Sequence, residues 1–144
     1  MFKLHPTLEK DCIVLGSFTL SRVLLMNDSQ YPWLILVPQI ENVAEIYQLS
    51  EPDQRQLLKE SCFLSQQLSK ITQADKINIA ALGNTVPQLH LHHIARFKHD
   101  PCWPKPIWGQ GPAIPYAPAA LNDLKSTLQQ CFERNCISPV IFTA

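Results

Sequence analysis

The chain has 144 residues, of which 46% are hydrophobic, and its 12 basic residues balance its 12 acidic residues. This length supports one core, so we expect a single domain over residues 1–144. A net charge of zero argues against binding to duplex nucleic acid or an anionic membrane, whereas a small phosphate-bearing ligand needs only local donors.

The chain also lacks the sequence features of exported and membrane proteins. No apolar run reaches the roughly 20 residues of a spanning helix, and the first six residues lack the apolar core of a signal peptide. The five cysteines are odd in number and form no Cys-x-x-Cys pair. This usage predicts reduced thiols in a cytoplasmic protein and argues against a disulfide framework or a zinc ribbon.

Three strands are predicted in the first quarter of the chain. Residues 11–18 and 22–26 are apolar and β-branched, and residues 33–37 form a continuous apolar run that Pro38 ends. The turn at residues 27–32 has the Asn, Asp, Ser and Pro of a tight reversal. Short turns between strands predict an antiparallel meander.

Helical patterns follow the meander. A short helix is predicted over residues 41–49, and a long amphipathic helix over residues 52–72. In the long helix Leu57, Leu64 and Leu68 recur at helical spacing, and Ser50 supplies a cap at its start. We expect this helix to cover the back face of the sheet.

Two further strands are predicted at residues 76–82 and 89–96, joined by a loop. Strands, one long helix and strands again indicate an α+β fold with about five antiparallel strands.

A C-terminal extension, residues 98–144, follows the strands. It begins with a Pro-rich segment, continues as a helix over residues 119–134, and ends in an edge strand or a tail at residues 140–142. Trp103 and Trp108 in the Pro-rich segment either stack on a base, with Lys105 meeting a phosphate, or bury apolar area and hold the loop in place.

The stretch from Asn84 to Arg96 holds three of the five histidines within four positions. In a strand, successive side chains point to opposite faces of the sheet. One face would carry Gln88, His90, His92 and Ile94, and the other would carry Leu89, Leu91, His93 and Ala95. Two imidazoles and a carboxamide would then line one face, while the leucines anchor the strand in the core. His93, on the opposite face, is expected to be a back-face or interface residue.

This stretch resembles the signature of the histidine triad (HIT) superfamily, His-φ-His-φ-His-φ-φ, where φ is apolar. His90 matches the middle histidine and His92 the last, whereas Gln88 stands in place of the first and His93 takes an apolar position. The resemblance extends over residues 10–97 and implies a HIT-like fold resembling bacterial nucleotide hydrolases. We find no counterpart for the C-terminal extension in the family pattern.

The resemblance implies a hydrolase of nucleotide phosphoanhydrides or a nucleotidyl transferase. His90 would attack the α-phosphorus to give a nucleotidyl-histidine, His92 would donate hydrogen bonds to phosphate oxygens, and Gln88 would orient the site. The implied substrates are dinucleoside polyphosphates, with diadenosine polyphosphate leading, or nucleoside phosphoramidates. The family also implies a homodimer and no required cofactor, with a divalent metal possible on the nucleotide.

Gln88 changes what this catalytic set can do. A carboxamide donates and accepts hydrogen bonds but does not titrate near neutral pH, so it cannot act as a general acid. Losing such help typically costs on the order of 10²–10⁴ in rate. We therefore expect a slower enzyme or a substrate with a good leaving group.

Four further residues are candidates for nucleotide binding. Asn27 and Asp28 end the second strand, where HIT proteins receive the ribose. Asn78 and Asn84 lie on the adjacent strand and loop, and could orient His90 or bind phosphate. Asn27, Asp28 and Asn84 are equally typical of turns, so both readings stay open.

Two other classes of function compete with the enzyme. His90 and His92 could bind zinc together with His99, Asp100 or Cys102, although no third ligand has a convincing spacing. A nucleotide-binding or scaffold protein could instead have kept the pocket without catalysis.

Overall fold

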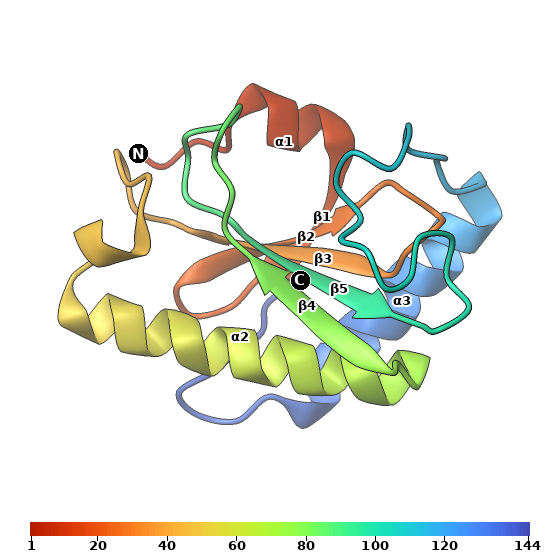
Figure 1. The fold of residues 1–144 in the computed structure, drawn as a ribbon. Helices are drawn as coiled ribbons and strands as arrows, with labels where there is room; N and C mark the ends of the chain where they lie inside the picture. Colours follow the sequence, from red (N-terminus) through yellow and green to blue (C-terminus); the bar gives the residue numbers. More distant parts are fainter.

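An antiparallel sheet of five strands forms the centre of the computed structural model, which describes residues 1–144 (Figure 1). The first three strands pair in chain order, as the predicted meander requires, and the fifth strand then lies between the third and the fourth. This arrangement confirms the predicted α+β class. The strands are β1 (Cys12–Ser17), β2 (Ser21–Met26), β3 (Trp33–Pro38), β4 (Lys76–Ala80) and β5 (Leu91–Arg96).

Strand β5 begins two residues later than predicted, at Leu91. Leu91 pairs with Leu36 on β3, so extending the ladder by two residues would place position 89 opposite Pro38. Proline has no N–H to donate, which ends the ladder at this point. The N–H of Leu89 instead donates to the carbonyl of Val43 at 2.9 Å.

Two long helices cover one face of the sheet, which we call the helix face. The main hydrophobic core lies between this face and the leucines of both helices, including Leu64 and Leu128. Helix α2 begins where Ser50 accepts a hydrogen bond from the N–H of Asp53, and it ends before Gln73, which has left-handed backbone angles. The two helices are α2 (Glu51–Thr72) and α3 (Pro118–Asn135).

The opposite face carries His92, Ile94 and Arg96, and we call it the histidine face. Helix α1 (Pro6–Asp11) lies over it, opposite α2 (Figure 1). Sequence reasoning missed α1 because six residues are too few for a helical period to be recognised. The Pro-rich segment packs on the same face, where Ile107 meets Ile94. The N-terminal helix and the Pro-rich segment therefore both border the strand that carries the histidines.

The predicted helix at residues 41–49 was mostly wrong. Only one turn of 3₁₀ helix forms, η1 (Ile46–Gln48). Asn42 adopts a φ of 58°, a left-handed conformation that stops a right-handed helix. Most of these side chains are exposed, so no apolar face is available to stabilise a longer helix.

The end of the chain is tied to the sheet by a single bridge between Ser17 and Thr143, which resolves the choice between strand and tail in favour of a tail. All five cysteines are free thiols. A cytoplasmic location stays a prediction. The helices of this chain are too short or too polar to cross a membrane.

Candidate functional site

Two imidazoles lie side by side where the chain enters β5. The ring centroids of His90 and His92 are 4.9 Å apart, and the residues are 6% and 5% exposed. Leu89 and Leu91 point the other way, into the main core. The alternation predicted from the sequence is therefore confirmed, and it gives two sheltered imidazoles in direct contact.

The main chain just before His90 orients its ring. Nδ1 of His90 lies 2.6 Å from the carbonyl oxygen of Gln88. A carbonyl oxygen only accepts hydrogen bonds, so Nδ1 carries the proton. In the neutral ring Nε2 then holds an unshared electron pair, which is what a nucleophile needs.

The ring of His92 is held in the opposite tautomer. The indole N–H of Trp33 donates to Nδ1 of His92 at 2.9 Å. Indole nitrogen is only a donor, so Nδ1 of His92 is unprotonated and Nε2 carries the proton. Burial, followed by the neighbouring His90 and His93, lowers the pKa of His92 to about 3. His92 is therefore a neutral ring that presents an N–H donor.

The side chain of Gln88 has partners that the sequence did not indicate. Its Oε1 accepts from the N–H of His5 at 2.8 Å, and its Nε2 donates to the carbonyl of Lys3 at 2.8 Å. Two atoms of the carboxamide are thus engaged with the N-terminal main chain. The direct catalytic role assigned to Gln88 stays a prediction.

A cavity of about 450 Å³ is lined by Asn27, Asp28, Trp33 and Trp108, and neither His90 nor His92 is part of its lining. Trp108 also packs edge-on against His92, with ring centroids 5.2 Å apart. Sequence reasoning missed Trp33, and it left Trp108 open between stacking on a base and holding a loop. The structure puts both indoles between the cavity and His92.

Asn27 and Asp28 line this cavity and also bind the main chain of the Pro-rich segment. The side-chain oxygen of Asn27 accepts from the N–H of Tyr116 at 3.0 Å, and Asp28 accepts from the N–H of Ile114 at 3.3 Å. Both residues therefore anchor the Pro-rich segment while lining the cavity. Their nucleotide-binding role stays a prediction.

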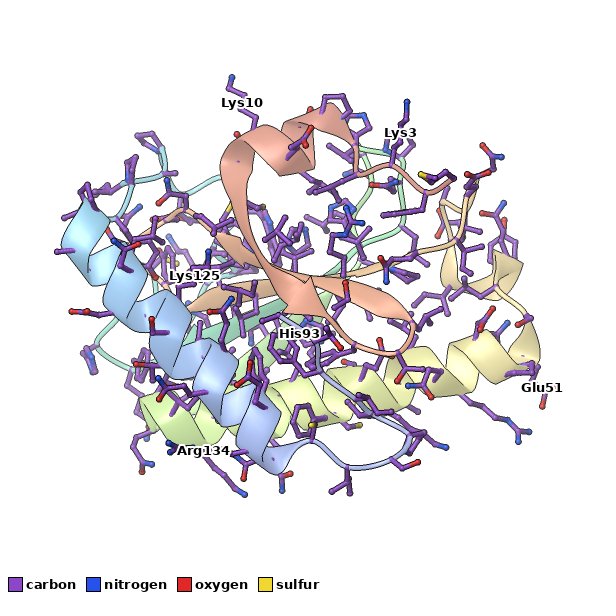
Figure 2. All side chains as sticks on the ribbon, turned by 180° about the vertical axis from the view of Figure 1, so that it is seen from behind. Lys3, Lys10, Glu51, His93, Lys125 and Arg134 are labelled. Carbon is purple, nitrogen blue, oxygen red and sulfur yellow. The ribbon has the colours of Figure 1, made fainter.

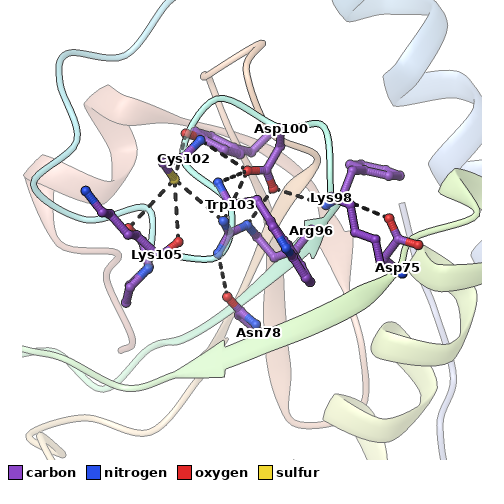
Figure 3. A network of polar contacts seen from close by, with 11 residues as sticks. Asp75, Asn78, Arg96, Lys98, Asp100, Cys102, Trp103 and Lys105 are labelled. Carbon is purple, nitrogen blue, oxygen red and sulfur yellow. Dashed lines mark hydrogen bonds and ion pairs between the residues drawn. The ribbon is translucent and has the colours of Figure 1, made fainter.

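Asn78 lies in a buried polar network centred on Arg96 (Figure 3). Arg96 is 1% exposed and donates to Asp100 at 2.7 Å and to Asn78 at 2.8 Å. Burial raises the pKa of Asp100, but hydrogen bonds from Arg96 and from main-chain N–H groups outweigh it and lower the pKa to about 2. The network joins β4, β5 and the Pro-rich segment.

Neither candidate asparagine hydrogen-bonds to a histidine. The amide oxygen of Asn78 is taken by Arg96, and Asn84 is exposed in the loop before β5. Their proposed contacts with phosphate stay predictions. The metal alternative is weakened, because Asp100 pairs with Arg96 and no group of three His, Cys, Asp or Glu side chains is arranged to hold a metal ion.

His93 lies on the helix face, inside the core (Figure 2). Its Nε2 is 2.7 Å from the hydroxyl of Ser61 on α2, and its Nδ1 is 3.1 Å from the carbonyl of Leu91. Burial lowers the pKa of His93 to about 4. The predicted back-face position is confirmed, and His93 is a satisfied core residue.

We expect the free energy of unfolding to fall as the pH drops from about 6.5 toward 4. His93 has a pKa of about 4 in the folded protein, whereas an unfolded histidine has about 6.5. The unfolded chain therefore binds more protons in this range, and His93 alone accounts for roughly 3 kcal/mol of lost stability. His92 acts in the same direction. Urea denaturation at several pH values would measure the slope.

The variant His93→Gln is the control for this pH dependence. Its slope between about pH 6.5 and 4 should be clearly shallower than that of the wild type, whatever its stability at neutral pH. Equal slopes in the two proteins would mean that His93 does not carry the effect.

A family model described as the HIT domain matches residues 7–99 of this chain. The match includes all of β1 to β5 and both imidazoles described above. A comparison with curated proteins gave no significant match.

Two solved structures of histidine triad proteins resemble this protein over nearly its whole length. A histidine triad protein from Marinobacter aquaeolei is 47% identical, with a TM-score of 0.91, and the alignment covers 94% of this chain and 99% of that one. A histidine triad protein from Bradyrhizobium japonicum is 43% identical, with a TM-score of 0.88 and coverage of 90% and 96%. Such coverage includes most of the C-terminal extension, so these two proteins share it, although the family model itself ends at residue 99.

A Streptococcus mutans protein shares only 18% identity, with a TM-score of 0.52 and coverage of 86% of this chain and 80% of that one. This last likeness concerns the fold alone.

Proposed function

Because this chain belongs to the HIT domain family, we propose that it is a nucleotide hydrolase or nucleotidyl transferase whose nucleophile is Nε2 of His90. One observation carries the proposal. In the neutral ring, the hydrogen bond from Nδ1 of His90 to the carbonyl of Gln88, at 2.6 Å, makes Nε2 the nitrogen without a proton. The neutral ring then presents the unshared electron pair of Nε2, which is the pair that a nucleophile uses.

The proposed reaction has two displacement steps at phosphorus. The electron pair of His90 Nε2 forms a bond to the α-phosphorus, and the bond from that phosphorus to the leaving group breaks, with its electron pair going to the leaving group. Water then attacks the nucleotidyl-histidine, the phosphorus–nitrogen bond breaks, and the nucleoside monophosphate leaves. The proposal needs no resident cofactor, and a divalent metal can enter with the substrate's phosphates.

His92 supports both steps as a donor. Trp33 keeps its Nδ1 as an acceptor, so its Nε2–H is available to a phosphate oxygen. Donors that are already in place before charge develops stabilise a transition state without reorganisation. The adjacent cavity, lined by Asn27, Asp28 and the two indoles, has the size and lining expected for a nucleoside.

This site differs from a site with three histidines in how the leaving group is protonated. Gln88 cannot supply a proton, and the low pKa of His92, about 3, keeps that ring neutral at pH 7. A polyphosphate leaves without full protonation, whereas an amine does not. We therefore propose a nucleotide phosphoanhydride, with diadenosine polyphosphate as the leading candidate, as the substrate.

We expect kcat/KM for a dinucleoside polyphosphate to exceed that for a phosphoramidate of the same nucleoside by on the order of 10²-fold, from the missing acid. Steady-state assays with matched pairs of adenosine and guanosine compounds would measure this ratio. Faster turnover of the phosphoramidate would contradict the substrate assignment. Tight binding without turnover of any compound would favour the non-catalytic nucleotide-binding alternative.

We further propose that two copies of the chain form a homodimer through β4. This strand pairs with β5 on one side only, so the sheet ends at an unpaired edge. Ile79 on β4 is 52% exposed, and Leu82 just after it is 45% exposed. Unpaired edges with apolar side chains readily pair with another chain.

The variant Ile79→Lys should convert the dimer into a monomer, which light scattering after size-exclusion chromatography would detect. Val14 provides a matched control, because it lies on the opposite edge strand β1 and is 44% exposed. Val14→Lys should leave the dimer intact. A wild-type mass corresponding to one chain at micromolar concentration would contradict the homodimer.

A further inference from the structure

Gln88 joins the N-terminal segment to the candidate active site. Its carboxamide accepts from the N–H of His5 and donates to the carbonyl of Lys3, each at 2.8 Å. These are the two main-chain groups that a neighbouring strand would satisfy. A carboxamide is the neutral side-chain end that offers a donor and an acceptor together, so glutamine suits this contact.

The N-terminal segment is itself fixed on the histidine face. Leu4, between the two contact points, is 9% exposed and packs with Leu8, Leu24 and Val86 in a separate apolar cluster. The side chain of His5 then accepts from the N–H of Thr7 and caps helix α1. Gln88 is therefore bound to a part of the chain that is packed against the sheet.

The main chain of Gln88 is the part that contacts the nucleophile. Its carbonyl oxygen accepts the proton of His90 Nδ1 at 2.6 Å. Residues 81–88 form no helix or strand, and most of them are exposed. The side-chain contacts of Gln88 are thus a restraint on a loop whose carbonyl must stay aligned with the ring.

We propose that Gln88 is a positioning residue, which ties residues 3–5 to the loop so that its own carbonyl keeps His90 in the Nδ1–H tautomer. Gln88 then acts through His90 and does not touch the phosphate. The proposal rests on the proposed function for its effect on rate, but the orientation of His90 can be measured without any substrate.

Two substitutions at His5 isolate one of the hydrogen bonds. His5→Pro removes the main-chain N–H that donates a hydrogen bond to Oε1 of Gln88. The φ of −59° at this position already suits proline. His5→Ala keeps the N–H and removes only the side chain that caps α1, so it is the matched control. Gln88→Leu removes the carboxamide itself and therefore both of its hydrogen bonds, to His5 and to Lys3. The double variant His5→Pro with Gln88→Leu completes the cycle.

We expect His5→Pro, which removes one hydrogen bond, to lower kcat about five- to tenfold with KM unchanged. Gln88→Leu, which removes both hydrogen bonds, should lower kcat at least as much, again with KM unchanged. His5→Ala should stay within about twofold of the wild type, and the double variant should be no worse than Gln88→Leu. Long-range proton–nitrogen NMR of the imidazoles should show the Nδ1–H form of His90 in the wild type and a mixture of tautomers in both single variants.

Three other results of these kinetic and NMR measurements would lead to different conclusions. If Gln88→Leu lowers kcat while His5→Pro matches His5→Ala, Gln88 acts on the substrate and the proposal is wrong. If the tautomer of His90 is the same in all variants, the contact is structural only and the proposal is again wrong. If no variant or wild type turns over nucleotides, the proposed function fails, and the NMR result still decides the role of Gln88.

Discussion

Replacing His90 by alanine is expected to lower turnover at least about 10⁴-fold, the scale seen when a nucleophile is removed. In the neutral ring, Nε2 of His90 is an acceptor nitrogen with no hydrogen-bond donor on it, whereas Nδ1 of His92 already accepts from Trp33. Nucleotide affinity should change little, because the cavity that we assign to the nucleoside is lined by other residues. Turnover assays and calorimetric titration would measure the two quantities separately.

His93 provides a control for this substitution within the same strand. It lies on the helix face with no contact to the cavity. His93→Gln should keep turnover within roughly tenfold of the wild type under conditions where it is folded. An His90→Ala protein with full activity would rule out the nucleophilic role.

Replacing Arg96 by methionine is expected to lower the free energy of unfolding by about 3–5 kcal/mol, the usual cost of breaking a buried ion pair from one side. Arg96 and Asp100 have side chains that are only 2% and 3% exposed. Removing the guanidinium leaves the Asp100 carboxylate buried with main-chain donors alone, and it also removes the partner of Asn78 (Figure 3). Urea denaturation monitored by tryptophan fluorescence would measure the loss.

The exposed pair between Arg55 and Glu51 on α2 is a matched comparison, because both side chains are 73% exposed. Arg55→Met should cost less than about 1 kcal/mol, since surface ion pairs are weak. Equal costs at Arg96 and Arg55 would show that burial of the network does not matter for stability.

Local patterns in the sequence predicted most of the fold. The leucines at helical spacing located α2, and the apolar runs between turns located the first three strands. The failure at residues 41–49 has a physical cause, because Asn42 is left-handed and the segment has no apolar face to bury. Helix α1 was missed because it is short and is capped by His5, a residue rarely considered as a cap.

The sequence predicted the candidate site only where its residues are close together in the chain. Alternation along one strand was enough to bring His90 and His92 together on one face. The partners that orient them come from far along the chain: Trp33 is 59 positions from His92, and the His5 contact to Gln88 spans 83 positions. No pattern within a strand or helix contains such contacts, so they could be found only in the folded structure.

The central claim is that His90 becomes covalently bound to the nucleotide, and mass spectrometry tests it most directly. The protein would be mixed briefly with diadenosine polyphosphate, quenched in alkali because phosphorus–nitrogen bonds hydrolyse in acid, and digested. We predict one added adenylyl group on the peptide containing His90, and none in the His90→Ala protein. An adenylyl group on a different side chain would contradict the account.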